Sequence, residues 1–303
     1  MDSDRLLIFF FALVVNLVNG AQSGAAVFDI PDGDIDAFKS AINIANANEE
    51  DDTIELATNG IYTVSTVDNF YVNALPAISS DGGHSLTIHG NGATLQRNTD
   101  YGTPPLRFFS LNPGATLIVD ALTMLGGDVR NAPGNTSTVC GAAAYNHGGV
   151  LIVVNSAFRG NRANIGGAIY NDGEYDAITL QLTNCVVENN SAILGGAISN
   201  YSPGPSIVIT IDQCMFTQNA AIGSFNVGRG GGAIMIDTYG TSTSITITRS
   251  TFTDNSAFSM CGGVICNRGG NITITNSSFL QNYASEGGVV YNNGATPANL
   301  FLN

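Results

Sequence analysis

Two glycines followed by alanine or valine and then an aliphatic residue recur through the second half of the chain. NIGGAIYN at 164–171 holds the clearest copy, and a degenerate copy lies at 141–144. Further tetrads begin at Gly195, Gly231, Gly262 and Gly287. Self-similarity with a period of roughly 20–50 residues is typical of solenoids. We therefore predict a stack of similar coils instead of a single closed core.

A second motif precedes each tetrad and consists of a large apolar residue with asparagine three positions later. Its copies are FRGN, VENN, FTQN, FTDN and FLQN, whose asparagines at 161, 190, 219, 255 and 282 are 29, 29, 36 and 27 residues apart. Stacked coils would align these residues into columns of core side chains and amide ladders. The predicted structural positions are Phe158, Asn161, Gly166, Gly167, Asn190, Gly195, Gly196, Phe216, Asn219, Gly231, Gly232, Phe252, Asn255, Gly262, Gly263, Phe279, Asn282, Gly287 and Gly288.

Each repeat also contains a run in which apolar and polar residues alternate, such as SITITRSTF at 244–252 and NITITNSSF at 271–279. A period of two places one face of a strand inward and the other toward solvent. The paired glycines permit a turn through positive φ or a close approach of neighbouring coils. The chain is thus predicted to be all-β, folded as a parallel β-helix.

The N-terminal part is expected to differ from the repeats. Residues 1–20 contain an apolar run and small residues typical of a cleaved signal peptide. Residues 21–60 should form a cap with a short amphipathic helix that begins at the N-cap Asp34. Residues 61–303 should form the β-helix, open or truncated at its C-terminal end, with early coils at 85–95 and 115–124.

Charge limits the possible partners. The chain has 10 Lys and Arg against 24 Asp and Glu, a formal net charge of −14, and its cations are scattered. Binding of nucleic acid needs clustered cations, so nucleic acid is excluded as an expected partner. No segment after the signal peptide is expected to span a membrane. The expected location is outside the cell or on its surface.

With these motifs, the sequence resembles the polymorphic outer membrane protein family across roughly residues 140 to 293. That family is characterised by FxxN and GGA[ILV] repeats. The resemblance implies a right-handed parallel β-helix of the pectate-lyase-like class, and adhesion or surface display as the function. It supplies no catalytic residues.

Many β-helix proteins act on polysaccharides, so the charged residues of the repeats are candidates for catalysis. Asp212, Asp237 and Asp254 lie at different registers of different coils, and Arg249 lies at a corner. An enzyme would be indicated if three carboxylates and an arginine converged in one groove. His84, His89 and His147 lack the spacing of a zinc site. We predict no catalytic residue, metal site or cofactor.

Other residues are candidates for modification or binding. Cys185 and Cys214 fall at equivalent positions of adjacent coils and either form a disulfide or fill the core as small side chains. Alternating directions argue against a bond between Cys261 and Cys266. Possible N-glycosylation sites are Asn135, Asn189, Asn200, Asn271 and Asn276. A possible binding face comprises Thr246, Thr248, Thr273 and Thr275, although β propensity explains outward threonines equally well.

Taken together, these features predict a secreted or surface β-helix that acts as a non-catalytic interaction or adhesion module. Its loops, such as residues 222–230, would contact a glycan or a cell-surface protein. End-to-end self-association is a further possible contact. The alternatives are a polysaccharide-active enzyme of the lyase or epimerase type, and an ice- or polysaccharide-binding protein that uses its threonine face.

Overall fold

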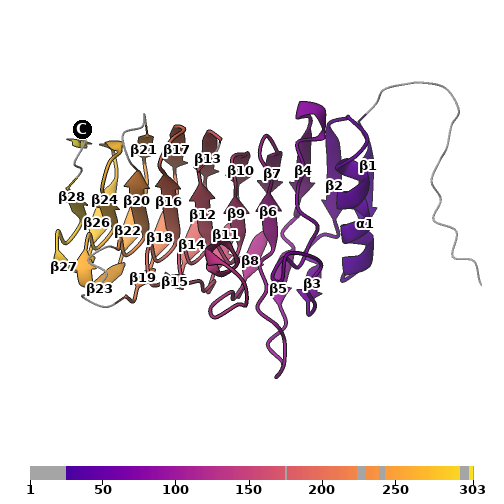
Figure 1. Ribbon diagram of the computed structural model, residues 1–303, viewed down its shortest axis with the longest axis horizontal. Helices are drawn as coiled ribbons and strands as arrows, with labels where there is room; N and C mark the ends of the chain where they lie inside the picture. The colour runs from indigo at the N-terminus through magenta and orange to yellow at the C-terminus, as the bar shows by residue number, and fades with distance from the viewer. Residues whose placement is uncertain (1–24, 175, 224–229, 239–242, 294–299, 303) are drawn as a thin grey trace, which may run out of the picture.

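The chain forms a parallel β-helix with one α-helix at its N-terminal end (Figure 1). The structure, a computed structural model, describes residues 25–174, 176–223, 230–238, 243–293 and 300–302. The predicted signal peptide and the middle of the predicted display loop at 222–230 lie outside these residues. Within the described part, every strand pairing between named strands is parallel, so the predicted fold class is confirmed.

The longest side of the stack is a 10-stranded sheet that also includes two strands from the segment expected to be the cap. In spatial order its strands are β1 (Val27–Ile30), β2 (Asp52–Leu56), β4 (Ser85–His89), β7 (Thr116–Asp120), β10 (Val150–Val154), β13 (Ile178–Thr183), β17 (Ile207–Asp212), β21 (Ser244–Thr248), β25 (Asn271–Thr275) and β29 (Leu300–Leu302). The expected early coils at 85–95 and 115–124 therefore belong to the stack.

Three further sheets form the other sides of the stack, and the 4-stranded sheet is confined to the later coils. The 8-stranded sheet comprises β3 (Ile61–Val64), β5 (Thr94–Arg97), β8 (Thr123–Leu125), β11 (Ala157–Arg159), β14 (Val186–Glu188), β18 (Met215–Thr217), β22 (Thr251–Thr253) and β26 (Ser278–Leu280). The 4-stranded sheet comprises β15 (Ser191–Ala192), β19 (Ala220–Ala221), β23 (Ser256–Cys261) and β27 (Tyr283–Glu286). The 7-stranded sheet comprises β6 (Phe109–Leu111), β9 (Ala144–Asn146), β12 (Ile169–Asp172), β16 (Ile198–Ser202), β20 (Ile234–Thr238), β24 (Ile265–Asn267) and β28 (Val290–Asn292).

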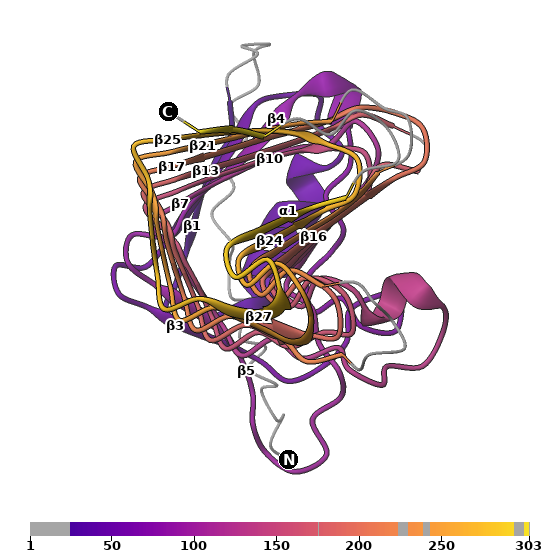
Figure 2. The same cartoon turned by 90° about the vertical axis from the view of Figure 1, so that its left-hand side faces the viewer.

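The coils wind in the right-handed sense. Viewed from the C-terminal end, the chain passes through the 10-, 8-, 4- and 7-stranded sheets in anticlockwise order while it advances toward the viewer (Figure 2). Right-handed winding is the normal sense for parallel strands joined by crossovers, because strands twist to the right. Two 3-10 helices, η1 (Asp81–Gly83) and η2 (Thr136–Val139), lie in longer connections outside the regular coil.

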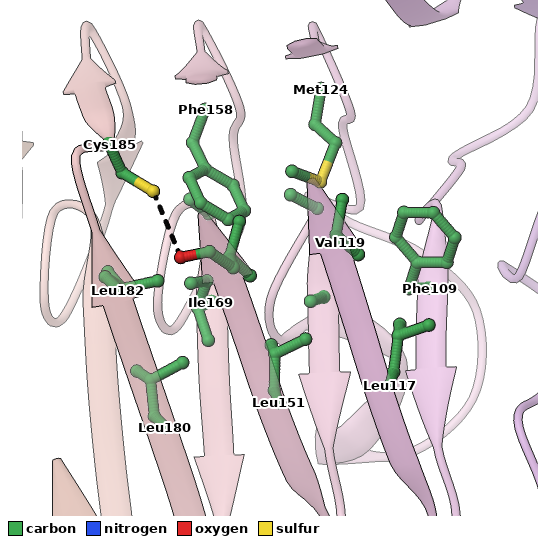
Figure 3. Packing of buried hydrophobic residues seen from close by; sticks show 14 of the residues in the cluster. Phe109, Leu117, Val119, Met124, Leu151, Phe158, Ile169, Leu180, Leu182 and Cys185 are labelled. Carbon is green, nitrogen blue, oxygen red and sulfur yellow. Dashed lines mark hydrogen bonds between the residues drawn. The ribbon is translucent and has the colours of Figure 1, made fainter. Parts of the chain in front are cut away.

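Inward side chains of successive coils form continuous columns. Phe158 pairs in register with Val187, and the column continues through Phe216, Phe252 and Phe279. The Phe216 and Phe252 rings stack with centroids 4.8 Å apart. Figure 3 shows the core around Phe158, on earlier coils of the stack, together with inward leucines of the 10-stranded sheet such as Leu151 and Leu182. Side chains at one register thus meet their own equivalents above and below.

Asparagines form a buried amide ladder at the corner after the 8-stranded sheet. Asn190 donates from Nδ2 to Asn219 Oδ1 at 3.0 Å, and Asn219 donates in turn to Asn255 Oδ1 at 2.9 Å. Each Nδ2 group also bonds to a backbone carbonyl, as Asn219 does with Val187 O at 2.8 Å. The predicted ladder is confirmed, and it satisfies backbone groups that the corner leaves without strand partners.

The two glycines of a tetrad have different roles in most coils, the exceptions being Gly231, which has no positive φ, and Gly288 of the last tetrad, which makes no close approach. The first, as in Gly166 and Gly262, has φ values of 60° and 71° and reverses the chain. The second lies against the same residue of the next coil: a Cβ on Gly167 would overlap the carbonyl oxygen of Gly196. The first glycine of the pair therefore provides the positive φ, and the second provides the close approach to the next coil.

A helix covers the first coil. The helix α1 (Ile35–Ala45) begins at Asp34, whose Oδ1 accepts the Ala37 N–H at 2.9 Å. Its buried side chains are Phe38, Ala41, Ile42 and Ala45. Phe38 packs edge-on against Tyr62 of β3, with ring centroids 6.0 Å apart. The amphipathic helix and its predicted N-cap are confirmed, and α1 shields the N-terminal end of the core.

The pairing of Cys261 with Cys266 corrects a prediction. These residues form a disulfide with a Cα–Cα distance of 5.7 Å. The argument from alternating directions fails because Gly262 adopts positive φ and turns the chain back between them. In an earlier coil the equivalent flanking residues, Ile165 and Tyr170, pack in a small cluster outside the main core. The disulfide replaces such an apolar contact near the C-terminal end.

Removing this disulfide by the double substitution Cys261→Ser, Cys266→Ser should lower the free energy of unfolding modestly. The bond spans a sequence separation of only 5, and closing so short a loop stabilises by about 2 kcal/mol in the chain-entropy model. Urea unfolding with and without a thiol reductant measures the effect. Reductant should destabilise the wild type and the matched control Cys185→Ser but not the double variant. A wild type insensitive to reductant would contradict the assignment.

Candidate functional site

A lateral cleft of about 580 Å³ opens beside the N-terminal part of the 7-stranded sheet. Its walls come from the turn at 69–73, from the outer face of β6, β9 and β12, and from the loop that contains η2. Figure 2 shows the η2 loop projecting from the side of the stack. The lining residues are Phe70, Tyr71, Asn73, Arg107, Ser110, Leu111, Asn112, Gly134, Asn135, Thr136, Ser137, Thr138, Tyr145, His147, Asp172 and Glu174.

Two adjacent aromatic residues form the rim of this cleft. Phe70 and Tyr71 are 70% and 69% exposed, and both have left-handed backbones with φ of 49° and 64°. Asn73 closes the turn by donating from its backbone N–H to Asn69 O at 3.0 Å and from Nδ2 to Asn69 Oδ1 at 2.8 Å. Bulky residues rarely adopt positive φ, and such strain concentrates at ligand sites. The turn holds two aromatic side chains at the cleft without burying them.

A carboxylate is fixed in the wall of the cleft. The Tyr145 hydroxyl on β9 donates to Asp172 Oδ2 on β12 at 2.6 Å, and the Tyr145 ring stacks on Tyr170 with centroids 5.7 Å apart. Burial, followed by the bond to Asp172, raises the pKa of Tyr145 above its usual value, so its proton remains available to the carboxylate. Tyr145 thus orients Asp172 as a hydrogen-bond acceptor.

Arg107 lies behind the cleft and supports the η2 loop. The residue is 3% exposed, and its guanidinium donates to the carbonyl oxygens of Ser137, Cys140 and Gly141. It also lies 4.8 Å from the centroid of the Tyr145 ring, a cation–π contact. Desolvation lowers the pKa of Arg107 to about 10, which leaves it charged at neutral pH. The residue positions the loop that forms one wall.

His147 and Glu174 complete the polar part of the lining. The His147 ring packs edge-on against Tyr145 with centroids 5.8 Å apart, and its Nε2 is buried. Glu174 is exposed at the mouth, and its backbone N–H donates to Asp172 Oδ1 at 3.3 Å. The cleft therefore combines aromatic surface with a small number of fixed polar groups, the usual composition of a ligand site.

The acidic residues considered for catalysis do not meet in this cleft. Asp212 pairs with Arg249 at a corner of the 10-stranded sheet, and Asp237 pairs with Arg268 beside the 7-stranded sheet at 3.2 Å. Hydrogen bonds from Thr248 and then Arg249 hold the pKa of Asp212 below its usual value. The described lining has two carboxylates and one arginine, one carboxylate short of the set expected for an enzyme.

The histidines do not build a metal site. In the part of the chain that the structure describes, no three His, Cys, Asp or Glu side chains gather as ligands. His89 instead lies 2.7 Å from Glu55, and His84 lies 3.8 Å from Asp51. Both of these histidines therefore make pairwise contacts on the early coils.

Cys185 and Cys214 are stacked on adjacent coils, as expected, but they are free thiols, so the possible disulfide between them is wrong. Cys185 N–H donates to Cys214 Sγ at 3.4 Å, and the Cys185 thiol donates to Val153 O, also at 3.4 Å (Figure 3). Ser250 has the equivalent role on the next coil, accepting the Cys214 N–H at 3.1 Å. Both thiols thus serve as members of a serine-like ladder, the alternative interpretation of their position.

The five sequons differ in accessibility. Asn200 is fully buried and hydrogen-bonds to Asn171 and to Met235 O. The prediction that Asn200 is glycosylated is therefore wrong for the folded protein. Glycosylation of the other four, which are exposed, stays a prediction; they are Asn135, Asn189, Asn271 and Asn276. Asn135 lies in the cleft lining, where its Oδ1 accepts the Ser137 N–H and caps η2.

The threonine face is assembled as expected. Thr246 pairs in register with Thr273, and Thr248 with Thr275, on the outer surface of β21 and β25. The Thr246 row continues to Thr210 and then changes to glutamine and isoleucine on earlier strands. Ligand binding by these threonines stays a prediction, because their outward position also follows from strand geometry.

Sequence reasoning did not find the cleft. Its walls are formed by residues far apart in the chain that lie mostly outside the repeat motifs. Two signals were present: adjacent aromatics between asparagines at 69–73, and the polar insertion at 134–138 ahead of the degenerate tetrad. Neither signal gives the position of one segment relative to the other, which the coil register decides.

The fold and cleft together define a parallel β-helix with a lateral cleft. A scan against protein-family models finds none that matches the chain. A search of curated proteins likewise finds no match. Among the described residues, α1 is too short to cross a membrane, and no helix has the length and apolar character of a membrane span.

Proposed function

We propose that this protein is a secreted or cell-surface β-helix that binds a glycan in its lateral cleft and carries out no catalysis. The observation that supports this proposal best is the strained pair Phe70 and Tyr71, exposed at the rim of a cleft that also contains the fixed carboxylate of Asp172. Exposed aromatic residues in a strained turn are costly for folding alone, which favours a role in binding.

A glycan fits the chemistry of the cleft. The C–H face of a sugar ring can pack on an aromatic side chain, burying apolar area on both. Its hydroxyl groups can donate to Asp172, and hydrogen bonds to an ionised acceptor are among the strong ones. The Tyr145 hydroxyl holds Asp172 in place before binding, which reduces the entropy lost on association.

The rest of the molecule suits display. The stacked coils form a rigid scaffold from which the η2 loop projects, and loops on such a scaffold commonly carry binding residues. The signal-like N-terminus and the resemblance to polymorphic outer membrane proteins support a location outside the cell. On this proposal, the cleft is the contact through which the protein adheres to a glycan-bearing surface.

Alanine substitution of the rim tests the site. A glycan array should first identify a ligand, and titration calorimetry should then show about tenfold or weaker binding for Phe70→Ala, Tyr71→Ala, because two aromatic contacts contribute ~0.5–1.5 kcal/mol each. Tyr101→Ala is the matched control, since Tyr101 is an exposed aromatic residue that lies outside the cleft lining. Equal losses for rim and control variants, or no glycan ligand, would refute the proposal.

A polysaccharide-active enzyme is the second candidate. It is favoured by the convergence of Asp172, Glu174 and His147 in one cleft, since such groups can transfer protons. Incubation of the identified glycan with the protein, followed by assays for new reducing ends and for unsaturated uronate products, separates the candidates. Turnover that is lost in Asp172→Asn would establish the enzyme and overturn the non-catalytic proposal.

A further inference from the structure

We infer that the cleft accepts glycans that are uncharged or carry amino groups and rejects glycans that carry carboxylate or sulfate groups. This inference rests on the proposed function and adds the class of ligand. It follows from which charged groups a bound molecule can contact. Arg107 lines the cleft but is buried, whereas the carboxylates of Asp172 and Glu174 are accessible.

The arginine in the lining is not available to an anion. Its Nε donates to Gly141 O at 2.9 Å, and its Nη2 donates to Cys140 O at 2.6 Å and to Ser137 O at 2.5 Å. Its Nη1 donates to Asn73 Oδ1 at 3.1 Å. Four of the five N–H groups of the Arg107 guanidinium are therefore engaged by the protein, and the side chain is buried, so the remaining Nη1 N–H cannot form a fork with an anion. Recognition of a uronate or sulfate needs free guanidinium donors in a fork geometry.

The accessible ionisable groups are acidic. Glu174 is exposed at the mouth and Asp172 is partly exposed in the wall, while the lining that the structure describes contains no lysine and no arginine other than Arg107. An anionic sugar would therefore meet two like charges at short range, on a chain whose formal net charge is −14. Like-charge contacts of this kind exclude wrong partners.

The carboxylate of Asp172 favours ligands that donate hydrogen bonds. Asp172 accepts the Tyr145 hydroxyl at Oδ2 and the Glu174 N–H at Oδ1, one bond to each oxygen. Each oxygen of an ionised carboxylate can accept about two hydrogen bonds, so one position on each is left for a ligand. Sugar hydroxyls and ammonium groups are donors that fill these positions, whereas a carboxylate has no proton to offer.

The test compares one glycan in two charge states. The neutral glycan identified on the array is oxidised at its primary hydroxyl groups to the corresponding uronate, and both forms are titrated against the protein. We expect the oxidised form to bind at least tenfold more weakly at low salt. Glu174→Gln, an exposed change that should leave folding intact, should reduce this difference several-fold. Asp254→Asn removes the same charge at an exposed corner outside the cleft and should leave it unchanged.

The possible outcomes distinguish the inference from the proposed function. Binding of the oxidised glycan as tightly as the neutral one, with both lost in Phe70→Ala, Tyr71→Ala, would overturn the inference and leave the glycan site intact. An equal effect of Glu174→Gln and Asp254→Asn would also overturn it, since selection would then come from net charge. Absence of any glycan ligand would overturn both.

Discussion

Replacing Gly196 with alanine is expected to destabilise the β-helix by about 3 kcal/mol or more, at the upper end of the range for overpacked sites. A Cβ at this position would overlap the carbonyl oxygen of Gly232 and would lie 2.6 Å from the carbonyl carbon of Ala220, so both clashes are with backbone. The Gly196 N–H bond to Gly231 O at 3.0 Å fixes the separation of these coils, and no rotamer change can relieve the contact.

Urea unfolding followed by circular dichroism measures this effect, with Gly160→Ala as the control. Gly160 has φ of 62°, and a methyl group added there would meet no atom within 4 Å. Alanine at this position should therefore cost only the left-handed backbone strain, about 1–2 kcal/mol. A Gly196→Ala variant as stable as Gly160→Ala would show that the coils can separate locally, and the close-approach role of the second glycine would be wrong.

Replacing Asn219 with alanine is expected to destabilise the protein by about 3–5 kcal/mol, since each buried polar group left without a partner costs ~1–3 kcal/mol. Asn219 is fully buried. Its Oδ1 accepts from both the backbone N–H and Nδ2 of Asn190, and its Nδ2 donates to Val187 O. The substitution therefore removes hydrogen bonds on both sides of the ladder, including the Asn219 Nδ2 bond to Asn255 Oδ1, and only the backbone N–H bond of residue 219 to Asn255 remains.

The neighbouring Asn189→Gly provides the control for this ladder. Asn189 is exposed at a corner with φ of 55°, a conformation that glycine adopts readily. Its substitution should change stability by less than ~0.5 kcal/mol, as expected for surface positions. If the two variants lost similar amounts of unfolding free energy, the amide ladder would contribute no more to stability than an exposed corner residue does.

The coil was predictable because each repeat obeys the same local rules. Alternation along 244–252 or 271–279 assigns inward and outward faces, and a recurring FxxN motif then brings Phe216, Phe252 and Phe279 into one column. The N-cap Asp34 and the apolar face of α1 follow from interactions within a few residues of each other. Local rules of this kind can be read directly from the order of residues.

The errors arose where a position depends on more than strand alternation. Cys261 and Cys266 meet because Gly262 reverses the chain between them. Cys185 and Cys214 are free thiols whose sulfurs take part in hydrogen bonds that serines make on other coils. Asn200 matches a sequon but is buried in an amide column. In each case, contacts with neighbouring coils or across a turn override the short motif.

The order of residues alone was enough to determine a stack of parallel coils, its columns and its helical cap, since these depend on periodicity and on local hydrogen bonding. The cleft was decided only by the tertiary structure. Phe70, Arg107, Asn135, Tyr145 and Asp172 come together because successive coils place distant segments side by side. The physical reason is that repeat register determines which coils are neighbours, whereas the geometry of the irregular loops determines how far each projects over the sheet.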